Sequence, residues 1–180
     1  MSTNLLTKAM SLAYLKEFGT PTHVVAHCIA VSEVAVMIGE ALNKKGFSLD
    51  LRMIEVSGLL HDMARTDDKH WEVTADFLQR RGFEQEAEII RVHMHHHFPD
   101  NPMCSTETDM VCLADRLVLE DQYVGLHRRM DYIIKKAGEQ VEIVQRIKDN
   151  KALVGAYILG LELILGDTID NIVQERKHNE

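Results

Sequence analysis

The chain has few of the residues that interrupt, cross-link or anchor a fold. Its 180 residues include three prolines, ten glycines, three cysteines and one tryptophan. The cysteines show no CxxC spacing, which excludes a disulfide framework and favours a reducing compartment. The first residues lack the apolar core of a signal peptide, and the most apolar late stretch, ALVGAYILGLELILG, is too short to span a bilayer and contains Glu162. We therefore expect a cytoplasmic protein without a membrane partner.

Positive charge is also scarce. The formal net charge is −8 at pH 7, so a broad surface for a nucleic acid polymer is not expected. A local basic pocket for a small phosphorylated ligand remains compatible with this balance. Hydrophobic residues make up 46% of the chain, which at this length is enough to bury the core of one domain.

Because prolines and glycines are rare, apolar residues recur at i, i+3 and i+4 spacing over long stretches, which is the pattern of amphipathic helices. This pattern predicts an all-α protein, folded as a compact multi-helix bundle. Helices are expected at roughly residues 4–18, 21–45, 50–62, 70–81, 84–97, 106–119 and 124–137, with one or two more in 139–178. We expect a helical domain over residues 1–138 and a C-terminal helical extension over 139–180 that packs on the same domain. The extension is also apolar enough to pack on a second chain, so a homodimer stays open.

Several ionisable residues lie among apolar neighbours. His27 shares a helix face with valines at i−3 and i+4, His61 and Asp62 follow two leucines in LLHDMAR, and Asp115 has valine, cysteine and leucine on its expected helix face. An unpaired buried carboxylate costs several kcal/mol. Separate partners are the simpler explanation, with a backbone carbonyl for His27 and an arginine for Asp115. A bound divalent cation explains all four together, because imidazole and carboxylate ligands suit transition metals.

The histidines extend this pattern. Six of the ten lie between residues 61 and 97. In the helix expected over 84–97, His93 shares a face with His96 and His97. The run HMHHH is equally compatible with a solvated cluster.

The order of these residues resembles the H…HD…D signature of the HD-domain superfamily of metal-dependent phosphohydrolases. The local contexts are similar too. HCIAVSEVA around His27 looks like that family's first signature helix, LLHDMAR around His61 and Asp62 like its LLHDIGK, and VCLADRLV around Asp115 like its AD-x-hydrophobic segment. The resemblance covers residues 20–135 and implies an HD-domain-like helical bundle.

Two further histidines resemble the second-metal positions of this superfamily. They are His70, in KHWEVTADFL, and His93, in AEIIRVHMHH. Met94 stands where some subfamilies have a second histidine, and the GYP-type segment is missing, which argues against the cyclic-dinucleotide phosphodiesterases. The layout looks closer to small bacterial HD proteins of the dinucleoside-tetraphosphatase type, or to HD modules fused to nucleotidyltransferases.

The resemblance implies one or two divalent transition metal ions, which Mn, Fe, Co, Ni or Zn would satisfy. It implies a first ion on His27, His61, Asp62 and Asp115, and a second on Asp62, His70 and His93. It also implies that water activated by metal hydrolyses a phosphoester or phosphoanhydride of a nucleotide or another small phosphorylated metabolite.

Other roles follow from position. Arg65 stands where the superfamily commonly has a lysine and could bind substrate phosphate, although a solvated loop arginine is an equal interpretation. Lys69 is a similar candidate, and His96 or His97 could protonate the leaving group. We therefore expect catalytic roles for Asp62, Arg65 and His96, and substrate contacts from Arg65, Lys69 and His97. The later basic segment LHRRMDYIIKK could line the pocket mouth, with a solvated helix face as the preferred interpretation.

Three alternatives remain at this point. A non-catalytic module could use the same metal pocket to sense a nucleotide. A structural helical protein could carry the HD pair by coincidence. An HD-type oxygenase with mixed-valence di-iron ranks below these, because nothing in the sequence points to dioxygen.

Overall fold

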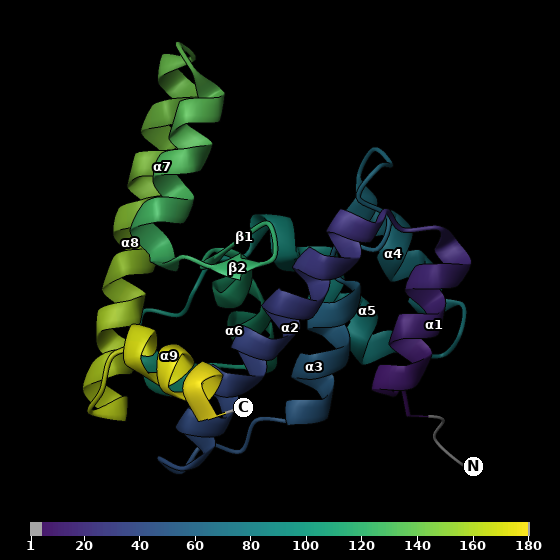
Figure 1. Cartoon of the computed structure of the whole chain (residues 1–180), viewed down its shortest axis with the longest axis horizontal. Coiled ribbons are helices and arrows are strands. Elements are labelled where there is room, and N and C mark those ends of the chain that lie inside the picture. Colours follow the sequence, from purple (N-terminus) through teal and green to yellow (C-terminus); the bar gives the residue numbers. More distant parts are fainter. Residues whose placement is uncertain (1–4, 180) are drawn as a thin grey trace.

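The computed structural model describes residues 5–179, with their side chains up to residue 176. Figure 1 shows that this part of the chain is almost entirely helical, which confirms the predicted all-α class. The helices are, in order, α1 (Lys8–Phe18), α2 (Thr22–Asn43), α3 (Leu51–Leu60), α4 (His70–Gln79), α5 (Glu84–Val92), η1 (His93–His95), η2 (Pro102–Cys104), α6 (Glu107–Asp115), α7 (Gly125–Ala137), α8 (Val141–Leu165) and α9 (Ile169–Asn179). The strands are β1 (Val118–Leu119) and β2 (Gln122–Tyr123).

Several helices begin at side chains that cap them. Asp50 accepts a hydrogen bond from the Met53 amide at the start of α3. A capping box starts α6, because the Thr106 amide donates to Asp109 Oδ2 at 2.7 Å and the Thr106 side chain caps the third helical residue. Such caps satisfy amides that have no partner within the helix.

The fifth helix is shorter than the sequence predicted. It ends at Val92 instead of reaching residue 97, and a single 3-10 turn, η1, follows it. The ring of His93 donates to the carbonyl of Ile90, which also accepts from the His93 amide, so the last turn tightens to i−3 bonding. The expectation that His93, His96 and His97 share one helix face was therefore wrong.

The sixth helix also ends early, at Asp115 instead of residue 119. The chain then forms a short antiparallel hairpin in which Val118 pairs with Tyr123 and Leu119 with Gln122. Glu120 takes a positive φ of 56° in the turn. The residues at i+3 and i+4 from Asp115 thus lie in the strand β1 and not on its helix.

The helix α2 lies at the centre and contacts α3, α6, α8 and α9. Its buried side chains join those of α6, α8 and α9 in the larger of two hydrophobic clusters, while α1, α3, α4 and α5 build the smaller one. By composition α2 is long and apolar enough to cross a membrane, but most of that stretch is buried inside the protein. Helices at the centre of a core have this character because they pack on several sides.

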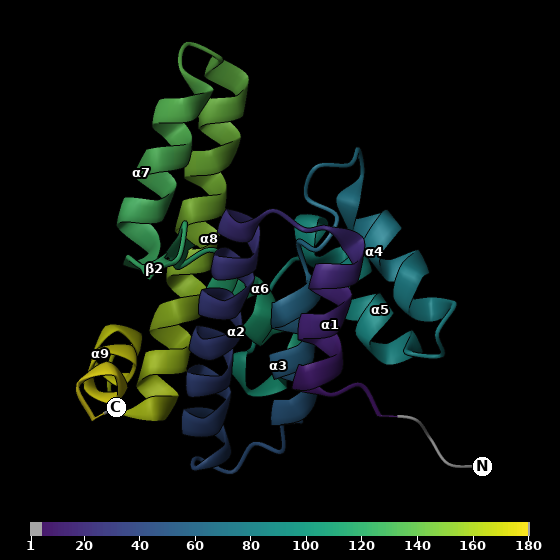
Figure 2. The same cartoon turned by 45° about the vertical axis from the view of Figure 1, so that its right-hand side comes forward.

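The C-terminal helices contribute to the same core. Val154, Leu161 and Val173 from α8 and α9 are fully buried beside residues of α2 and α6. The upper parts of α7 and α8 project together beyond the body of the molecule, as both ribbon views show (Figures 1 and 2). An ion pair between Lys151 and Asp131, at 2.8 Å, joins the two helices.

The helices α2 and α3 cross very closely at Gly58. A Cβ atom at this position would lie 2.8 Å from the Cα of Ser32, so the two helix backbones would have to separate. We expect Gly58→Ala to lower the free energy of unfolding by about 2 to 3 kcal/mol, measured by urea denaturation.

Gly155→Ala is the matched control for this substitution. In α8 a Cβ at position 155 would meet only Leu126 Cδ2, at 3.8 Å, which is ordinary contact. Alanine has the higher helix propensity, so we expect this variant to be unchanged or up to about 1 kcal/mol more stable. Equal stability of the two variants would contradict the close crossing at Gly58.

Candidate metal centre

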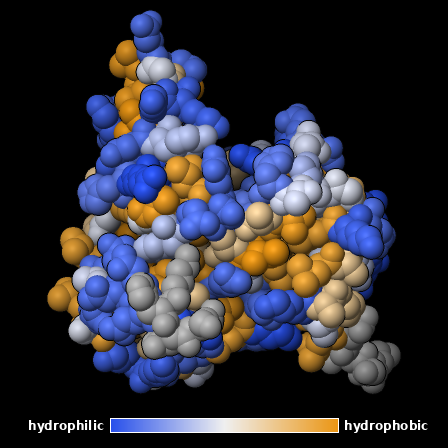
Figure 3. All heavy atoms as spheres, in the orientation of Figure 1, coloured by the Kyte–Doolittle hydropathy of each residue, from blue (hydrophilic) through white to orange (hydrophobic). Residues whose placement is uncertain are grey.

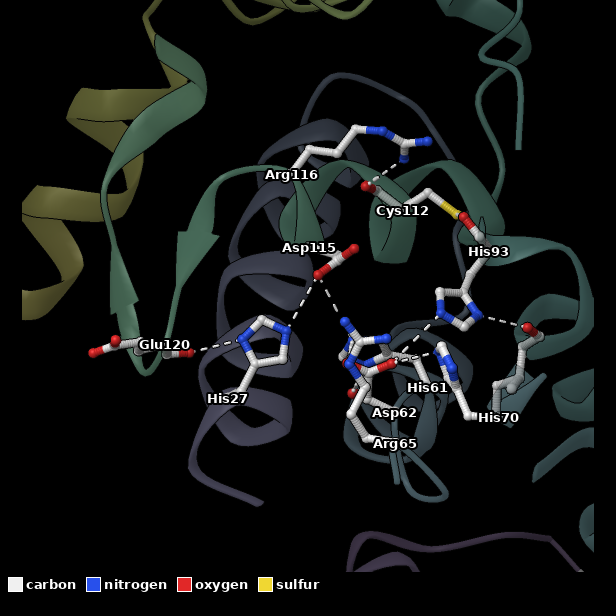
Figure 4. Close-up of polar contacts among 12 residues, drawn as sticks. His27, His61, Asp62, Arg65, His70, His93, Cys112, Asp115, Arg116 and Glu120 are labelled. Atoms are coloured by element: carbon white, nitrogen blue, oxygen red, sulfur yellow. Dashed lines mark hydrogen bonds and ion pairs between the residues drawn. The ribbon is translucent and has the colours of Figure 1, made fainter. Parts of the chain in front are cut away.

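The six residues predicted as metal ligands converge where several helices end (Figure 4). Asp115 is the last residue of α6, and His70 is the first residue of α4. His61 and His93 each follow the last residue of a helix, α3 and α5, and Asp62 follows His61. His27 is the exception, because it lies in the second turn of α2.

These residues form two groups of three, each able to offer three ligand atoms that lie within 4.8 Å of one another. In the first group, Asp115 Oδ1 is 3.2 Å from His27 Nε2 and 3.8 Å from His61 Nε2. In the second, Asp62 Oδ1 is 2.9 Å from His70 Nε2 and 3.7 Å from His93 Nε2. The other oxygen of Asp62 is 3.7 Å from His61 Nε2, so this carboxylate lies between the groups.

Hydrogen bonds to the backbone orient three of the four imidazoles. Their Nδ1 atoms lie within 2.7 to 2.8 Å of carbonyl oxygens, His27 with Glu120, His61 with Gly58 and His93 with Ile90. A carbonyl only accepts, so each Nδ1 carries a proton, and in a neutral ring the lone pair is then on Nε2. The three rings thus present Nε2 as the ligand atom.

The Nε2 atoms of three of the four histidines are buried without a hydrogen bond. They belong to His61, His70 and His93, whose exposures are 0%, 4% and 4%. The Nε2 of His70 comes close to Asp62, but no hydrogen bond aligns with it among the residues that the structure describes. Buried polar atoms are rarely left without partners, so several orphaned nitrogens aimed at one place indicate a missing ligand.

The two carboxylates occupy positions where negative charge is unfavourable. Asp62 and Asp115 lie at the C-terminal ends of α3 and α6, where the helix dipole repels an anion. Burial would raise the pKa of both. Neighbouring histidines outweigh burial and hold both pKa values well below the usual range, helped at Asp62 by Arg65. Both carboxylates are therefore ionised at neutral pH, which leaves a concentration of negative charge for a cation to neutralise.

The pKa values of two histidines shift in opposite directions. Burial lowers the pKa of His61, which is therefore neutral. Burial would also lower the pKa of His27, but the hydrogen bond to Asp115 and the charge of that carboxylate raise it above the ordinary value. A metal ion binds only neutral imidazole, so His27 would release its proton when an ion replaces it between the ring and Asp115.

The donor set fits divalent transition metals. Imidazole nitrogens together with carboxylate oxygens are ligands that Mn, Fe, Co, Ni and Zn accept. The orphaned nitrogens and the contacts of Nδ1 with backbone carbonyls fit a role of these residues as ligands. The two groups could therefore hold divalent metal ions.

Both groups open into a cavity of about 960 Å³. In Figure 3 the surface is hollowed at the top of the view, between the projecting α7–α8 pair and the part of the body that contains α4. Arg65 lines this cavity beside the ligands, and its Nε lies 3.3 Å from Asp62 Oδ2. Its side chain is half exposed, so the rest of the guanidinium is available to a ligand in the cavity.

The structure does not bring Lys69, His96 and His97 to this cluster. His96 Nε2 lies 2.7 Å from Asp109 Oδ1, away from the cavity lining. His97 and Lys69 are exposed and do not line the cavity either. The early end of α5 explains the positions of His96 and His97, since the backbone leaves the helix before them and is extended at His96.

Two features of the site had no clear signal in the sequence. One is the Glu120 carbonyl that holds His27, because a backbone atom in a hairpin turn leaves no residue pattern. The other is the part of α7 that lines the cavity, including Arg129 and Lys136. The basic segment LHRRMDYIIKK contains both residues, but a solvated face was the preferred interpretation there.

One curated protein and one family model match part of this chain. An uncharacterized protein of Methanocaldococcus jannaschii is 37% identical over 71 residues, which are 38% of this chain and 42% of that protein. The match thus spans less than half the length of this relative. No solved structure gives a significant match. The HD domain matches residues 24–119, more than half of the chain, and this range contains all six ligand positions. The chain belongs to the HD domain family.

Proposed function

We propose that the chain is a metal-dependent phosphohydrolase, which cleaves a phosphoester or phosphoanhydride of a nucleotide or another small phosphorylated metabolite. The observation that carries this proposal is the pair of donor groups with Asp62 between them, open to one cavity. Membership of the HD domain family supports it, since HD domains are generally metal-dependent hydrolases.

Divalent ions held by the two groups would supply Lewis acidity, which would strengthen water as a nucleophile and stabilise negative charge on phosphoryl oxygens. The residues of the chain orient the candidate metal ligands and bind the substrate. Backbone carbonyls keep His27, His61 and His93 in the tautomer that binds a cation. The half-exposed guanidinium of Arg65 lies at the edge of the cluster, where its donors can bind two oxygens of one phosphoryl group.

Elemental analysis of protein purified without added metal, paired with a phosphatase screen over nucleotides and sugar phosphates, tests this function. We expect divalent ions to fill both donor groups and inorganic phosphate to be released from at least one compound class. Metal and nucleotide binding without phosphate release across the panel would favour the sensing module instead. Protein without bound metal and without activity would contradict the proposal, and mixed-valence iron with oxygen consumption would favour an oxygenase.

A further inference from the structure

The cavity extends well beyond the metal ligands. Its volume of about 960 Å³ lies at the upper end of the range for small-molecule sites, roughly 300 to 1,000 Å³. One wall carries the ligands, and the opposite wall is built by α7 with the start of α8. A single phosphoryl group at the metal centre would leave the space along α7 unfilled.

The face of α7 that lines this space adjoins the part of the helix that packs in the hydrophobic core. Arg129, Tyr132, Ile133 and Lys136 line the cavity and follow the i, i+3, i+4, i+7 spacing of one helix face. At the base of α7, Leu126 is buried in the main hydrophobic core together with residues of α2 and α8. The cavity-lining face is therefore fixed in direction and is not a freely solvated surface.

Arg129 has no hydrogen bond or ion pair within the described part of the chain, and its Nε is buried. The side chain as a whole is partly exposed, so the other donors of its guanidinium are open to a ligand in the cavity. Two turns further on, Lys136 Nζ lies 4.8 Å from the centre of the Tyr132 ring and forms no ion pair with any described residue. Two cations on one face of α7 thus lack anionic partners in a protein whose net charge is −8.

Apolar side chains also contribute to this wall. Ile133 lies between the two cations, and Leu119 from the hairpin and Ile147 from α8 line the cavity near it. The acidic side chains on the lining outside the metal ligands are Glu120 and Asp121, which are exposed on the hairpin. The wall therefore combines unpaired positive charge with apolar surface.

We infer that α7 is the specificity wall of the site: Arg129 and Lys136 bind a second phosphoryl group of the substrate, while Ile133, Leu119 and Ile147 cover its apolar or aromatic body. The preferred substrate is then an organic phosphoanhydride, such as a nucleoside diphosphate, and not a small phosphomonoester. This inference rests on the proposed function for the reacting phosphoryl group at the metal centre, but the binding contacts on α7 do not require turnover.

Calorimetric titration of manganese-loaded protein with methylene-bridged ADP, whose phosphorus–carbon bridge resists hydrolysis, tests the contacts directly. We expect Arg129→Ala to weaken binding by roughly 10- to 100-fold, the loss of charge-assisted hydrogen bonds. Arg128→Ala is the matched control, because Arg128 is the adjacent residue on α7, exposed and outside the cavity lining. It should bind the analogue as the unaltered protein does. Equal affinity of all three proteins, or an equal loss in both variants, would overturn the inference.

Kinetics give a second readout. We expect Arg129→Ala to lower the ratio of kcat/KM for ADP to kcat/KM for phenyl phosphate by a similar factor, whereas Arg128→Ala leaves that ratio unchanged. A loss that is equal for both substrates would assign Arg129 a structural role and overturn the inference. If the unaltered protein releases phosphate from no compound of the screen, the proposed function fails, and the titration still decides whether α7 binds the second phosphoryl group.

Discussion

Asp62→Asn should lower the rate of phosphate release by at least about a thousandfold. The carboxylate lies between both donor groups, with one oxygen 2.9 Å from His70 Nε2 and the other 3.7 Å from His61 Nε2. Asparagine has nearly the same shape, but it is neutral and replaces one oxygen with an amide donor that cannot bind a cation. Metal ions contribute several kcal/mol to stabilising the transition state, and about 1.4 kcal/mol corresponds to each tenfold in rate.

The measurement is kcat for the best substrate of the phosphatase screen, together with the metal content of each protein. Asp68→Asn makes the same chemical change at an exposed position in the same loop and should keep both full activity and full metal content. Circular dichroism would establish that both variants fold. If Asp62→Asn retained the activity of the unaltered protein, the hydrolase assignment would be wrong.

Removal of the metal should lower the melting temperature by roughly 10 °C. The apo protein keeps three orphaned Nε2 atoms and two carboxylates in a largely buried cluster. An ion present at a thousand times its dissociation constant stabilises the fold by about 4 kcal/mol, and a chain of this size gains about 2 to 4 °C per kcal/mol. Calorimetry of protein stripped with a chelator, and of the same protein reloaded with manganese, measures the difference.

The Asp62→Asn protein is the control for this experiment, because the chelator should hardly change its melting temperature. A chelator that destabilises both proteins equally acts on something other than the cluster. Coincident melting curves for stripped and reloaded protein would show that the cluster gains no stability from an ion, contrary to its orphaned nitrogens.

Helix ends were predictable where a residue type marks them. His70 begins α4 as predicted, and α7 ends at Ala137, directly before Gly138, whose φ is positive. The end of α5 was not predictable, because no glycine or proline stops the pattern before Pro99. The bond from the ring of His93 to the Ile90 carbonyl accompanies the tightening of that helix end, and such a bond is visible only once the ring is placed. The hairpin after α6 has strands of two residues, too short to show an alternating pattern.

The six candidate ligands could be singled out from their order and local contexts, and the expected grouping agrees with the two groups of donors except that Asp62 was expected in both. Sequence order alone gives no reason to separate His61 from Asp62, although the structure places their donor atoms in different groups. The contribution of α7 was hidden for another reason. The sequence pattern of a basic, amphipathic helix is the same whether its cations face solvent or line a cavity. The packing of Leu126 in the core decides which face of α7 is turned toward the cavity.

The bond from His27 to the Glu120 carbonyl means that a candidate metal ligand is supported by the peptide chain and not by a side chain. An alanine scan would overlook this support, since replacing the glutamate leaves its peptide oxygen in place. The support depends instead on the length and register of the hairpin, which is tied to α9 through the contact of Tyr123 with Asp170. We therefore expect insertions and deletions at this turn, and not point substitutions, to change the position of His27. Through the contact with α9, the C-terminal helix can also influence this hairpin and the site.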